Sequence, residues 1–484
     1  MKSHLLKIVS LAAMLALNPV AAPGDTGDNL PDFGDSSGSL ISPTREFELG
    51  KEFMRSVTAQ VQLVDDPHIQ QYIRRLGERL VSHSDAPRYP FTFFVIEDSS
   101  VNAFAGPGGY IGVHTGLILA GRNESELAGV LAHEIAHVTQ RHLLRAYESA
   151  QQLSLPTAAA TIAALLLGAA TSSDAGIAAA SAIQAGNIQH QLNFTRANEK
   201  EADRIGIQTL DRSGFDPYGM PSFFERLYQS TRLYGSASIP EFLSTHPVTS
   251  DRIAETMERA AQLGKTREND STEFQLARAR LKVTTADDTR PVLREYAALS
   301  AKPDAGPADH YGLALAKWRN GDTAAARELL QDLLASDPDR ILYRTTLAEL
   351  QMDTGNPREA LQLYKDTLAL YPGDLEVGEY YAAALLRTGQ AAAARSQVLD
   401  MLRDRQARTP AIYELWGKAA RIAGPEWETR QAAAELHFLR GNFPLAVEQL
   451  EQALKYPELS PYDEARVRAR LKEFKTAIEE RSKK

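Results

Sequence analysis

The spacing of apolar residues changes along the chain and divides it into regions of different expected structure. In four stretches apolar residues recur every three or four positions, which predicts amphipathic helices at about 43–57, 67–82, 125–147 and 198–213. β-Branched and aromatic residues fill 91–96, which predicts a strand, and two shorter apolar runs at 102–105 and 110–113 predict two more. This part of the chain is therefore expected to combine several helices with a small sheet.

The C-terminal part repeats a helical pattern at a fixed interval. The positions that lie 34 residues apart are Gly321, Gly355 and Gly389 among the glycines, and Pro338 and Pro372 among the prolines. A period of 34 residues is typical of tetratricopeptide repeats, each of which is a helix–turn–helix unit. A fourth unit around Gly441 follows Gly389 after 52 residues, or about one and a half repeats. Because such units stack into a superhelix, we expect a concave surface that binds peptide or protein.

The N-terminal residues have the pattern of a secretory signal. Lys2 and Lys7 give a positive start, and a ten-residue apolar run over 8–17 is followed by small residues. The run is shorter than the roughly 20 apolar residues that a membrane-spanning helix needs. We expect residues 1–22 to direct Sec-dependent export, the alternative being an anchor that stays attached. Residues 23–42, rich in Gly, Asp, Ser and Pro, are expected to form a flexible leader.

Composition narrows the classes of protein and of chemistry. The 484 residues carry a formal net charge of -9, which argues against a nucleic-acid-binding surface. The chain has no cysteine, so disulfides, cysteine-ligated zinc, iron–sulfur clusters and a thiol nucleophile are excluded. An exported chain without cysteine does not have to manage its redox state, which favours a bacterial periplasm. Any metal site must use other residue types.

Residues 156–183 are rich in alanine and almost uncharged. The apolar-biased stretch 157–170 contains 14 residues and is too short to span a bilayer. Two interpretations stay open. One is a helical hairpin packed on the rest of the protein, and the other is an element that contacts a lipid surface or a partner.

The strongest local signal for chemistry is His133-Glu134-Ile135-Ala136-His137, which lies within an otherwise apolar predicted helix. Residues four apart lie on one face of a helix, so His133 and His137 are placed to hold one Zn²⁺. Glu134 would lie beside the water on that ion and take its proton, because the metal lowers the pKa of the water toward 7. Burying two histidines and a glutamate without a partner is costly, which favours a metal site.

A zinc hydrolase of this kind needs a third protein ligand and one open position. The metzincin continuation requires Gly at 140 and His at 143, and the chain has Gln140 and Leu143 there. The gluzincin alternative takes a glutamate from a later helix. We expect Glu199 to be this ligand, with Glu201 as the competing choice. Asp203, one turn after Glu199, is expected to hold the other nitrogen of a ligand histidine.

Five motifs, in order along the chain, resemble the HtpX and CAAX-prenyl-protease class of zinc metallopeptidases. They are Glu46…Gly50; Asn102-Ala103-Phe104-Ala105 with Pro107-Gly108-Gly109; His133-Glu134-x-x-His137 followed by Arg141-His142; Glu199-x-x-Ala202-Asp203; and His246-Pro247 followed by Arg252. With a signal peptide ahead and tetratricopeptide repeats behind, most of the chain resembles periplasmic members of this class. The resemblance implies a membrane-associated protease and chaperone that assists outer-membrane β-barrel assembly and degrades stalled barrel proteins.

The resemblance also implies roles for three further groups. Asn102-Ala103-Phe104-Ala105 would form the edge strand that pairs with an extended substrate. His246 would occupy the fourth position of the zinc ion and keep the enzyme off, because a fourth protein ligand displaces the attacking water. Arg252 is a candidate for stabilising the oxyanion of the tetrahedral intermediate.

Three further histidines are interpreted as structural or exposed, namely His114, His142 and His190. His142 follows His137 by five residues. On a continuous helix this places it about 140° around the axis from His137, where it is poorly placed to bind the same ion.

The sequence thus predicts an α+β chain that is mostly helical. Its expected parts are a signal peptide (1–22), a flexible leader (23–42), a gluzincin-type zinc metalloprotease domain with a small β-sheet (43–262), a helical linker (263–300), an all-α tetratricopeptide-repeat superhelix (301–475) and a charged tail (476–484). One Zn²⁺ per chain is expected, held by His133, His137, Glu199 and, in the resting state, His246.

The expected partners are outer-membrane β-barrel proteins and their assembly machinery, bound through the repeats. A peripheral contact with the outer membrane is left open, and no nucleic acid is expected. The alternative function is that of a non-proteolytic chaperone or adaptor in which the repeats act and the protease is latent. A dead protease used as a scaffold is a third interpretation, which the intact Glu134 weakens.

Overall fold

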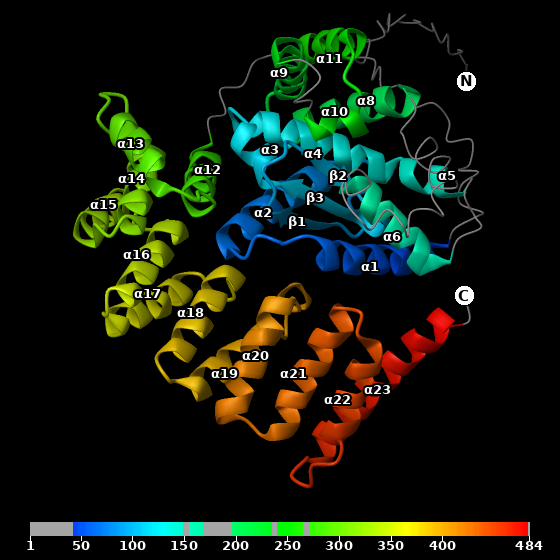
Figure 1. Ribbon diagram of the computed structural model, residues 1–484, viewed down its shortest axis with the longest axis vertical. Coiled ribbons are helices and arrows are strands. Elements are labelled where there is room, and N and C mark those ends of the chain that lie inside the picture. Colours follow the sequence, from blue (N-terminus) through cyan, green and yellow to red (C-terminus); the bar gives the residue numbers. More distant parts are fainter. Residues whose placement is uncertain (1–41, 149–153, 168–195, 235–239, 265–270, 483–484) are drawn as a thin grey trace, which may run out of the picture.

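The computed structural model describes residues 42–148, 154–167, 196–234, 240–264 and 271–482. Figure 1 shows a mixed α/β part and a row of helices that follows it and curves around one side of it. The chain is an α+β protein, mostly helical, that ends in an all-helical region, which confirms the predicted fold class. The predicted signal peptide and nearly all of the predicted leader lie outside the described residues.

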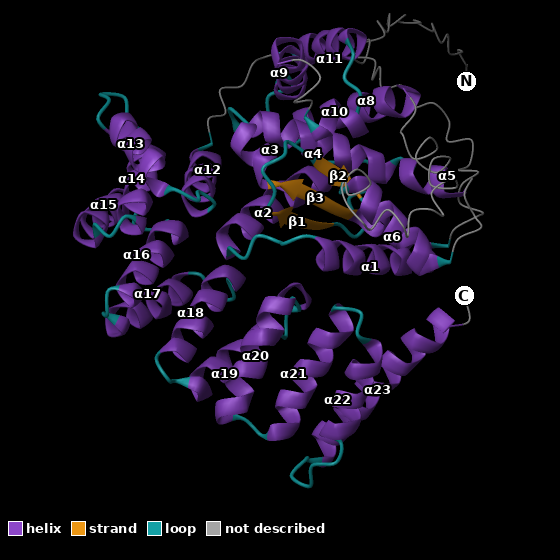
Figure 2. Ribbon diagram, in the orientation of Figure 1, coloured by secondary structure: helices purple, strands orange, loops and turns teal. Residues whose placement is uncertain are grey.

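A three-stranded sheet lies at the centre of the α/β part (Figure 2). In spatial order its strands are β1 (Thr92–Ile96), β3 (Tyr110–His114) and β2 (Ala103–Ala105). β1 runs parallel to β3 and β2 runs antiparallel to it. β2 is therefore an edge strand of the described sheet, on the opposite side from β1.

Helices surround this sheet and complete its cores. They are α1 (Pro43–Gln60), α2 (Pro67–Ser82), α3 (Thr115–Ala120), α4 (Glu124–Thr139), α5 (His142–Glu148), α6 (Leu155–Leu166), α8 (Arg196–Arg212), α9 (Gly219–Tyr234), α10 (Glu241–Thr245) and α11 (Ser250–Leu263). α2, α4 and α9 share one apolar core with β1 and β3, whereas α1 and α6 pack in a second core. The four predicted helices and three predicted strands all lie close to observed elements.

Helix α4 is buried along nearly its whole length, and small residues let its neighbours come close. The side chain of Asn123 accepts a hydrogen bond from the backbone N–H of Glu126 at 2.9 Å and so caps the first turn. On α8, a Cβ added to Gly206 would lie 3.1 Å from the Cα of His133. This close approach of α8 to α4 brings the carboxylates of one helix within reach of the histidines of the other.

The single helix predicted over 125–147 is wrong, because the structure has two helices there. α4 ends at Thr139, and Arg141 has a φ of 56° in the left-handed region, which non-glycine residues seldom adopt. α5 begins directly afterwards at His142. The polar and apolar spacing continues across the break, so the periodicity gave no sign of it.

The repeat part contains the helix pairs that the 34-residue period predicts. Its helices are α14 (Pro307–Arg319), α15 (Thr323–Ser336), α16 (Ile341–Asp353), α17 (Pro357–Leu370), α18 (Leu375–Arg387), α19 (Ala391–Met401), α20 (Pro410–Ala423), α21 (Glu426–Leu439), α22 (Phe443–Ala453) and α23 (Pro461–Ser482). Gly321, Gly355, Gly389 and Gly441 each turn the chain between two helices with a φ between 77° and 87°. Helix α20 supplies the extra half repeat between the last two of these glycines.

Two predicted segments differ in detail from what the structure shows. The expected helical linker contains α12 (Thr272–Thr284) and α13 (Thr289–Ser300), whose apolar residues share one core with α14, α15 and α16. The expected charged tail continues helix α23 as far as Ser482. The boundaries of the parts stay predictions.

Among the described residues, helices of the C-terminal part contact the α/β part near α2 and near α1. Arg280 on α12 donates to Asp66, the N-cap of α2, at 2.7 Å and to Tyr380 on α18 at 3.0 Å. At the other end, the guanidinium of Arg55 on α1 lies 4.3 Å from the ring centre of Phe443 on α22. The concave side of the repeats therefore faces α1 and α2 (Figure 1).

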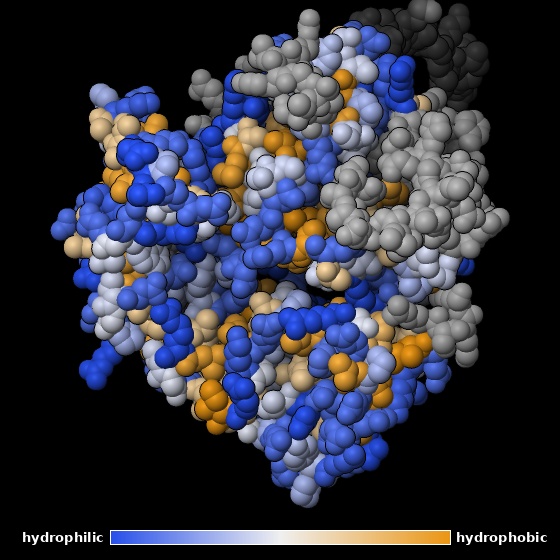
Figure 3. Space-filling view, in the orientation of Figure 1, coloured by the Kyte–Doolittle hydropathy of each residue, from blue (hydrophilic) through white to orange (hydrophobic). Residues whose placement is uncertain are grey.

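The surface of the molecule is largely hydrophilic in the orientation of Figure 3, with apolar patches over the repeats and a hollow between the repeats and the α/β part. Helix α6 covers the first half of the alanine-rich segment 156–183 and packs against α1. The second half lies outside the described residues. Among the described helices, none is both long enough and apolar enough to cross a membrane.

Candidate metal centre

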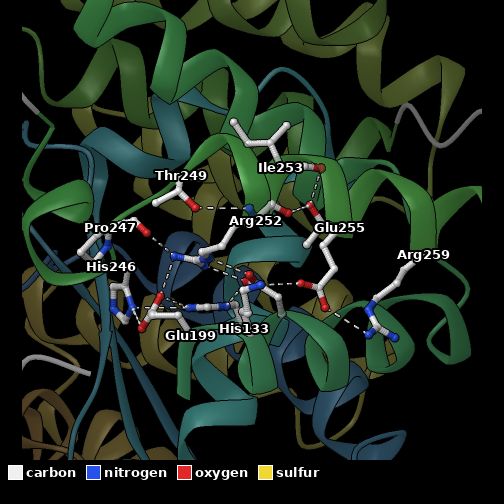
Figure 4. Close-up of polar contacts among 12 residues, drawn as sticks. His133, Glu199, His246, Pro247, Thr249, Arg252, Ile253, Glu255 and Arg259 are labelled. Atoms are coloured by element: carbon white, nitrogen blue, oxygen red, sulfur yellow. Dashed lines mark hydrogen bonds and ion pairs between the residues drawn. The ribbon is translucent and has the colours of Figure 1, made fainter. Parts of the chain in front are cut away.

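Four side chains from three parts of the chain meet beneath the sheet edge. His133 and His137 come from α4, Glu199 comes from the first turn of α8, and His246 follows directly after α10. All four are buried, and within the described residues they offer four ligand atoms that lie within 4.8 Å of one another. Figure 4 shows His133, Glu199 and His246 converging on one point.

The distances among the ligand atoms are mostly close to those expected around a tetrahedral ion, and all four atoms lie within 4.8 Å of one another. Nε2 of His133 lies 3.0 Å from Nε2 of His137 and 3.4 Å from Nδ1 of His246. The carboxylate oxygens of Glu199 lie 3.5 Å, 3.4 Å and 3.1 Å from the nitrogens of His133, His137 and His246. Ligands 2.0–2.1 Å from a tetrahedral ion are about 3.3–3.4 Å apart. The donor set of three imidazoles and one carboxylate is therefore one that could hold a metal ion.

The carboxylate of Asp203 contacts the ring of His133 on the side that points away from the cluster. Its Oδ1 lies 3.0 Å from Nδ1 of His133, the ring nitrogen that points away from the cluster. A carboxylate at this position keeps the proton on Nδ1 and leaves Nε2 free to bind a metal. The position is the one that the sequence predicts for Asp203, although its role stays a prediction.

Arg252 binds carboxylates rather than facing the open side of the cluster. Its guanidinium donates to both oxygens of Asp203 at 2.7 Å and lies 2.7 Å from Oε2 of Glu199. A further N–H donates to the carbonyl of Pro247 at 2.9 Å (Figure 4). The predicted oxyanion role of Arg252 stays a prediction. The observed contacts show a residue that ties α8 to the turn after His246.

Glu134 lies on the side of the cluster that faces β2. It is fully buried, and its Oε1 lies 3.4 Å from Nε2 of His246. Burial disfavours the charged carboxylate and raises the pKa of Glu134, while the positive charges of His246 and His133 and the backbone amide of Ala105 act in the opposite direction. A carboxylate with a raised pKa beside a metal site is suited to take a proton from water.

The metal-free cluster divides its charges unequally. Burial disfavours charge on His133, but hydrogen bonds to Asp203 and Glu199 outweigh it and raise the pKa of His133 to about 9. Burial lowers the pKa of His137 well below its usual range. For Glu199, burial opposes ionisation, but the charge of His246 and hydrogen bonds from the histidines hold the pKa well below its usual range. An anionic Glu199 and a neutral His137 are forms that bind a cation, whereas His133 has to lose a proton when a metal binds.

The strand predicted to bind substrate, β2, lies next to this site, and its residues are buried. Asn102, Ala103, Phe104 and Ala105 are all buried, and β2 packs against α4. The amide nitrogen and oxygen of Asn102 have no hydrogen-bond partner among the described residues. Just before the strand, the carbonyl of Val101 accepts a hydrogen bond from the backbone N–H of Phe242 at 3.1 Å. The segment that carries His246 thus also contacts the start of the edge strand.

His142 and Glu201 are two neighbours of the site that contact each other and lie outside the ligand cluster. His142 is fully buried and its Nδ1 lies 2.9 Å from Nδ1 of His137. Glu201, the competing ligand, lies 3.0 Å from Nε2 of His142 instead of joining the cluster. His114 is buried against Ser100, and His190 lies outside the described residues. The one sequence signal for His142 was its place in the motif after Arg141.

Comparison with known proteins shows to which family this chain belongs. Residues 67–260 match Peptidase family M48, and residues 351–419 match a tetratricopeptide repeat family. The chain is 35% identical over 481 residues to the beta-barrel assembly-enhancing protease of Escherichia coli, covering 98% of this chain and 97% of that protein. The chain belongs to peptidase family M48. This confirms the resemblance inferred from the five motifs.

Two further M48 relatives show how far the similarity extends. The putative beta-barrel assembly-enhancing protease of Vibrio cholerae is 37% identical over 91% of both chains. A mitochondrial metalloendopeptidase, OMA1 of Schizosaccharomyces pombe, is 32% identical over 38% of this chain and 50% of its own length. As a member of this family the chain is a metalloendopeptidase, which implies a metal ion, and the structure shows a buried, histidine-rich cluster that could hold one.

Proposed function

We propose that this M48 peptidase is a periplasmic zinc enzyme that acts on outer-membrane β-barrel proteins, degrading misassembled ones and assisting the assembly of others. The observation that carries the catalytic part is the burial of His133, His137, Glu199 and His246 together, with four ligand atoms within 4.8 Å of one another. The barrel-directed part is supported by relatives that match nearly the full length and are named beta-barrel assembly-enhancing proteases. The signal-like N-terminus supports export to the periplasm.

In this proposal His133, His137 and Glu199 hold the zinc ion throughout. When bound, zinc supplies a Lewis acid and a water whose pKa is close to 7. Glu134 accepts the proton of the attacking water and later donates it to the leaving amine, since its buried carboxyl group lies beside the ligand cluster. Asp203 keeps the proton of His133 on Nδ1, so that Nε2 remains a ligand.

The substrate would add to the edge of β2 that faces away from β3, once that edge is uncovered. An extended peptide at a sheet edge satisfies its backbone N–H and C=O groups against the strand, largely without regard to its sequence. The unpartnered amide of Asn102 lies where the strand begins and supplies one more donor and acceptor. Stalled β-barrel proteins expose extended strands, so this mode of binding fits that substrate class.

A resting state held by His246 is part of the proposal. Its Nδ1 occupies the fourth corner of the ligand set and its Nε2 faces Glu134. Both the position of the attacking water and the general base are therefore blocked by one ring. Activation requires the segment that follows α10 to move away from the cluster and from Val101.

The second candidate function is a chaperone or adaptor in which the peptidase stays latent. The contact of His246 with the ligand cluster favours it, because a closed site leaves the repeats as the working surface. Replacing Glu134 with Gln distinguishes the protease function from the chaperone function, since the amide cannot act as a base. We expect E134Q to keep its metal, to lose cleavage of an unfolded barrel precursor, and to lose the degradation of stalled barrels in cells.

Full barrel assembly and clearance in cells by the metal-loaded E134Q protein would favour the chaperone function and contradict proteolysis as the main one. Cleavage that persists in purified E134Q would contradict the proposed role of Glu134 itself. E225Q is a matched control, because Glu225 is an exposed glutamate on α9. It should behave like the unaltered protein in both assays.

A further inference from the structure

The side chains of His137, His142 and Glu201 contact one another in that order, in a line from the metal cluster to the surface of the protein. Nδ1 of His137 meets Nδ1 of His142 at 2.9 Å, and Nε2 of His142 meets Oε2 of Glu201 at 3.0 Å. His142 has no exposed surface, whereas about a third of the Glu201 side chain is exposed. Neither residue offers an atom to the ligand cluster itself.

We propose that His142 and Glu201 are positioning residues that fix the tautomer and the ring orientation of His137 for metal binding. This inference rests on the proposed zinc site. A buried neutral imidazole carries one proton on one of its two nitrogens, so each contact in the line must have one donor and one acceptor. The two contacts then constrain each other.

Only one assignment of protons satisfies the whole line with neutral rings. If Nε2 of His137 binds the metal, its Nδ1 carries the proton and donates to Nδ1 of His142. The proton of His142 is then on Nε2 and donates to the carboxylate of Glu201. The carboxylate, which only accepts when ionised, thus sets the direction of both hydrogen bonds and leaves the lone pair of Nε2 on His137 free for the metal.

The other ligand histidine, His133, also contacts a carboxylate of α8, and it does so directly, without an imidazole between them. Nδ1 of His133 meets Asp203 directly, and Asp203 is two residues beyond Glu201 on α8. Each ligand histidine of α4 is therefore backed by a carboxylate of α8, in one case directly and in the other through an imidazole. Outer carboxylates of this kind raise the basicity of a ligand histidine and hold its ring in place.

The backbone that delivers His142 is strained and held by a separate contact. Arg141 adopts a φ of 56°, which turns the chain back so that His142 comes under His137 instead of continuing around the helix. A guanidinium nitrogen of Arg141 lies 3.3 Å from a carboxylate oxygen of Glu46, whose other oxygen accepts a hydrogen bond from Tyr89. Strained residues persist where surrounding contacts hold them, and they concentrate at functional sites.

The test measures metal binding in the full chain rather than activity. In H142F the ring is kept and both hydrogen bonds are lost, so the affinity for zinc, measured by competition with a chelator, should fall about 10–100-fold. In H142N the amide oxygen replaces the acceptor at Nδ1, and most of the affinity should return. In E201Q an uncharged oxygen still accepts, so a smaller loss is expected.

Two further measurements separate positioning from a purely structural role. The visible absorption spectrum of the cobalt-substituted protein reports ligand geometry and should change in H142F. The melting temperature of each metal-free protein reports the fold. The matched control is E255Q, because Glu255 is as exposed as Glu201 and pairs with Lys200 and Arg259. It should leave both zinc affinity and the cobalt spectrum unchanged.

The inference is overturned if H142F and E201Q bind zinc within about twofold of the unaltered protein. It is also overturned if the cobalt spectrum of H142F is unchanged and its affinity falls only in step with the melting temperature. E201Q keeps the test decisive if H142F fails to fold, because Glu201 is partly exposed. Failure of the unaltered chain to bind zinc would contradict the proposed function instead, so the two failures are distinguishable.

Discussion

Nδ1 of His246 lies 3.1 Å from Oε1 of Glu199, although 47 residues separate the two in the chain. The other nitrogen of the same ring lies 3.4 Å from Oε1 of Glu134. One imidazole therefore contacts both a ligand carboxylate and the proposed general base. The Phe242 side chain stacks on this imidazole with 4.9 Å between ring centres, which keeps the ring in that place.

Replacing His246 with Ala should raise proteolysis. The substitution removes the fourth ligand and leaves a position for water on the metal, while His133, His137 and Glu199 keep the ion. We expect at least a severalfold increase in the cleavage rate of an unfolded protein substrate, with unchanged metal content. H83A is the control, because His83 is exposed at the end of α2. A variant that keeps its metal and is inert would contradict the role assigned to His246.

Replacing Arg252 with Ala should destabilise the protein strongly. Arg252 is buried, and removing it takes its guanidinium away from the carboxylates of Asp203 and Glu199, which then keep only their contacts with the histidines. Breaking a buried ion pair in this way costs about 3–5 kcal/mol, which urea denaturation of the metal-free protein would show. In R259A, which loses only a partly exposed pair with Glu255, the loss should stay below about 1 kcal/mol.

The R252A variant also tests the oxyanion role predicted from sequence. A structural residue lowers stability and metal affinity together, because Asp203 and Glu199 lose their fixed positions. If R252A instead retains both and shows a fall in kcat alone, then Arg252 acts on the reacting group. That result would overturn the positioning role that its contacts indicate.

The contact between α18 and α2 should weaken as the pH rises. Burial raises the pKa of Glu379 on α18 to about 7, and the nearby Asp65, Asp66 and Glu376 add to the effect. Because this pKa is above that of an unfolded glutamate, the folded protein binds more protons between about pH 4.5 and 7. Its stability therefore falls as the pH rises through that range.

Replacing Glu379 with Gln removes the contribution of this carboxyl group to the pH dependence of stability. We expect E379Q to raise the free energy of unfolding by on the order of 1 kcal/mol at pH 8 and to change it little at pH 5. Urea denaturation at the two pH values measures both. Glu359 is exposed on α17, and E359Q should change the two values equally. Equal effects of E379Q at both pH values would contradict the assignment.

The parts of the site that sequence predicted are those fixed by local geometry. His133 and His137 are one helical turn apart, so their common face follows from their spacing alone. Glu199 followed from chemistry, because a zinc hydrolase without cysteine needs a further carboxylate or histidine. His246 lies 113 residues beyond His133, and the resemblance rather than spacing pointed to it. The structure brings these four side chains together as the sequence led us to expect.

What the sequence did not predict depends on backbone conformation or on distant contacts. His142 was interpreted as structural or exposed and as poorly placed to bind the ion of His137, and it lies outside the ligand cluster. Its contact with His137 was not predicted, because the left-handed conformation of Arg141 separates the two helices at that point. The repeat period predicted the helix pairs well. It did not predict the contact of Arg280 with Asp66, 214 residues earlier, because that contact depends on how the superhelix curves.

The central claim is that His133, His137 and Glu199 hold one catalytic zinc ion, and metal analysis of the purified protein tests it most directly. The account predicts close to one zinc per chain in the unaltered protein and in E255Q. It predicts loss of most of the zinc, together with loss of proteolysis, in E199A. A full complement of zinc in folded E199A, or no zinc in the unaltered protein, would contradict the account.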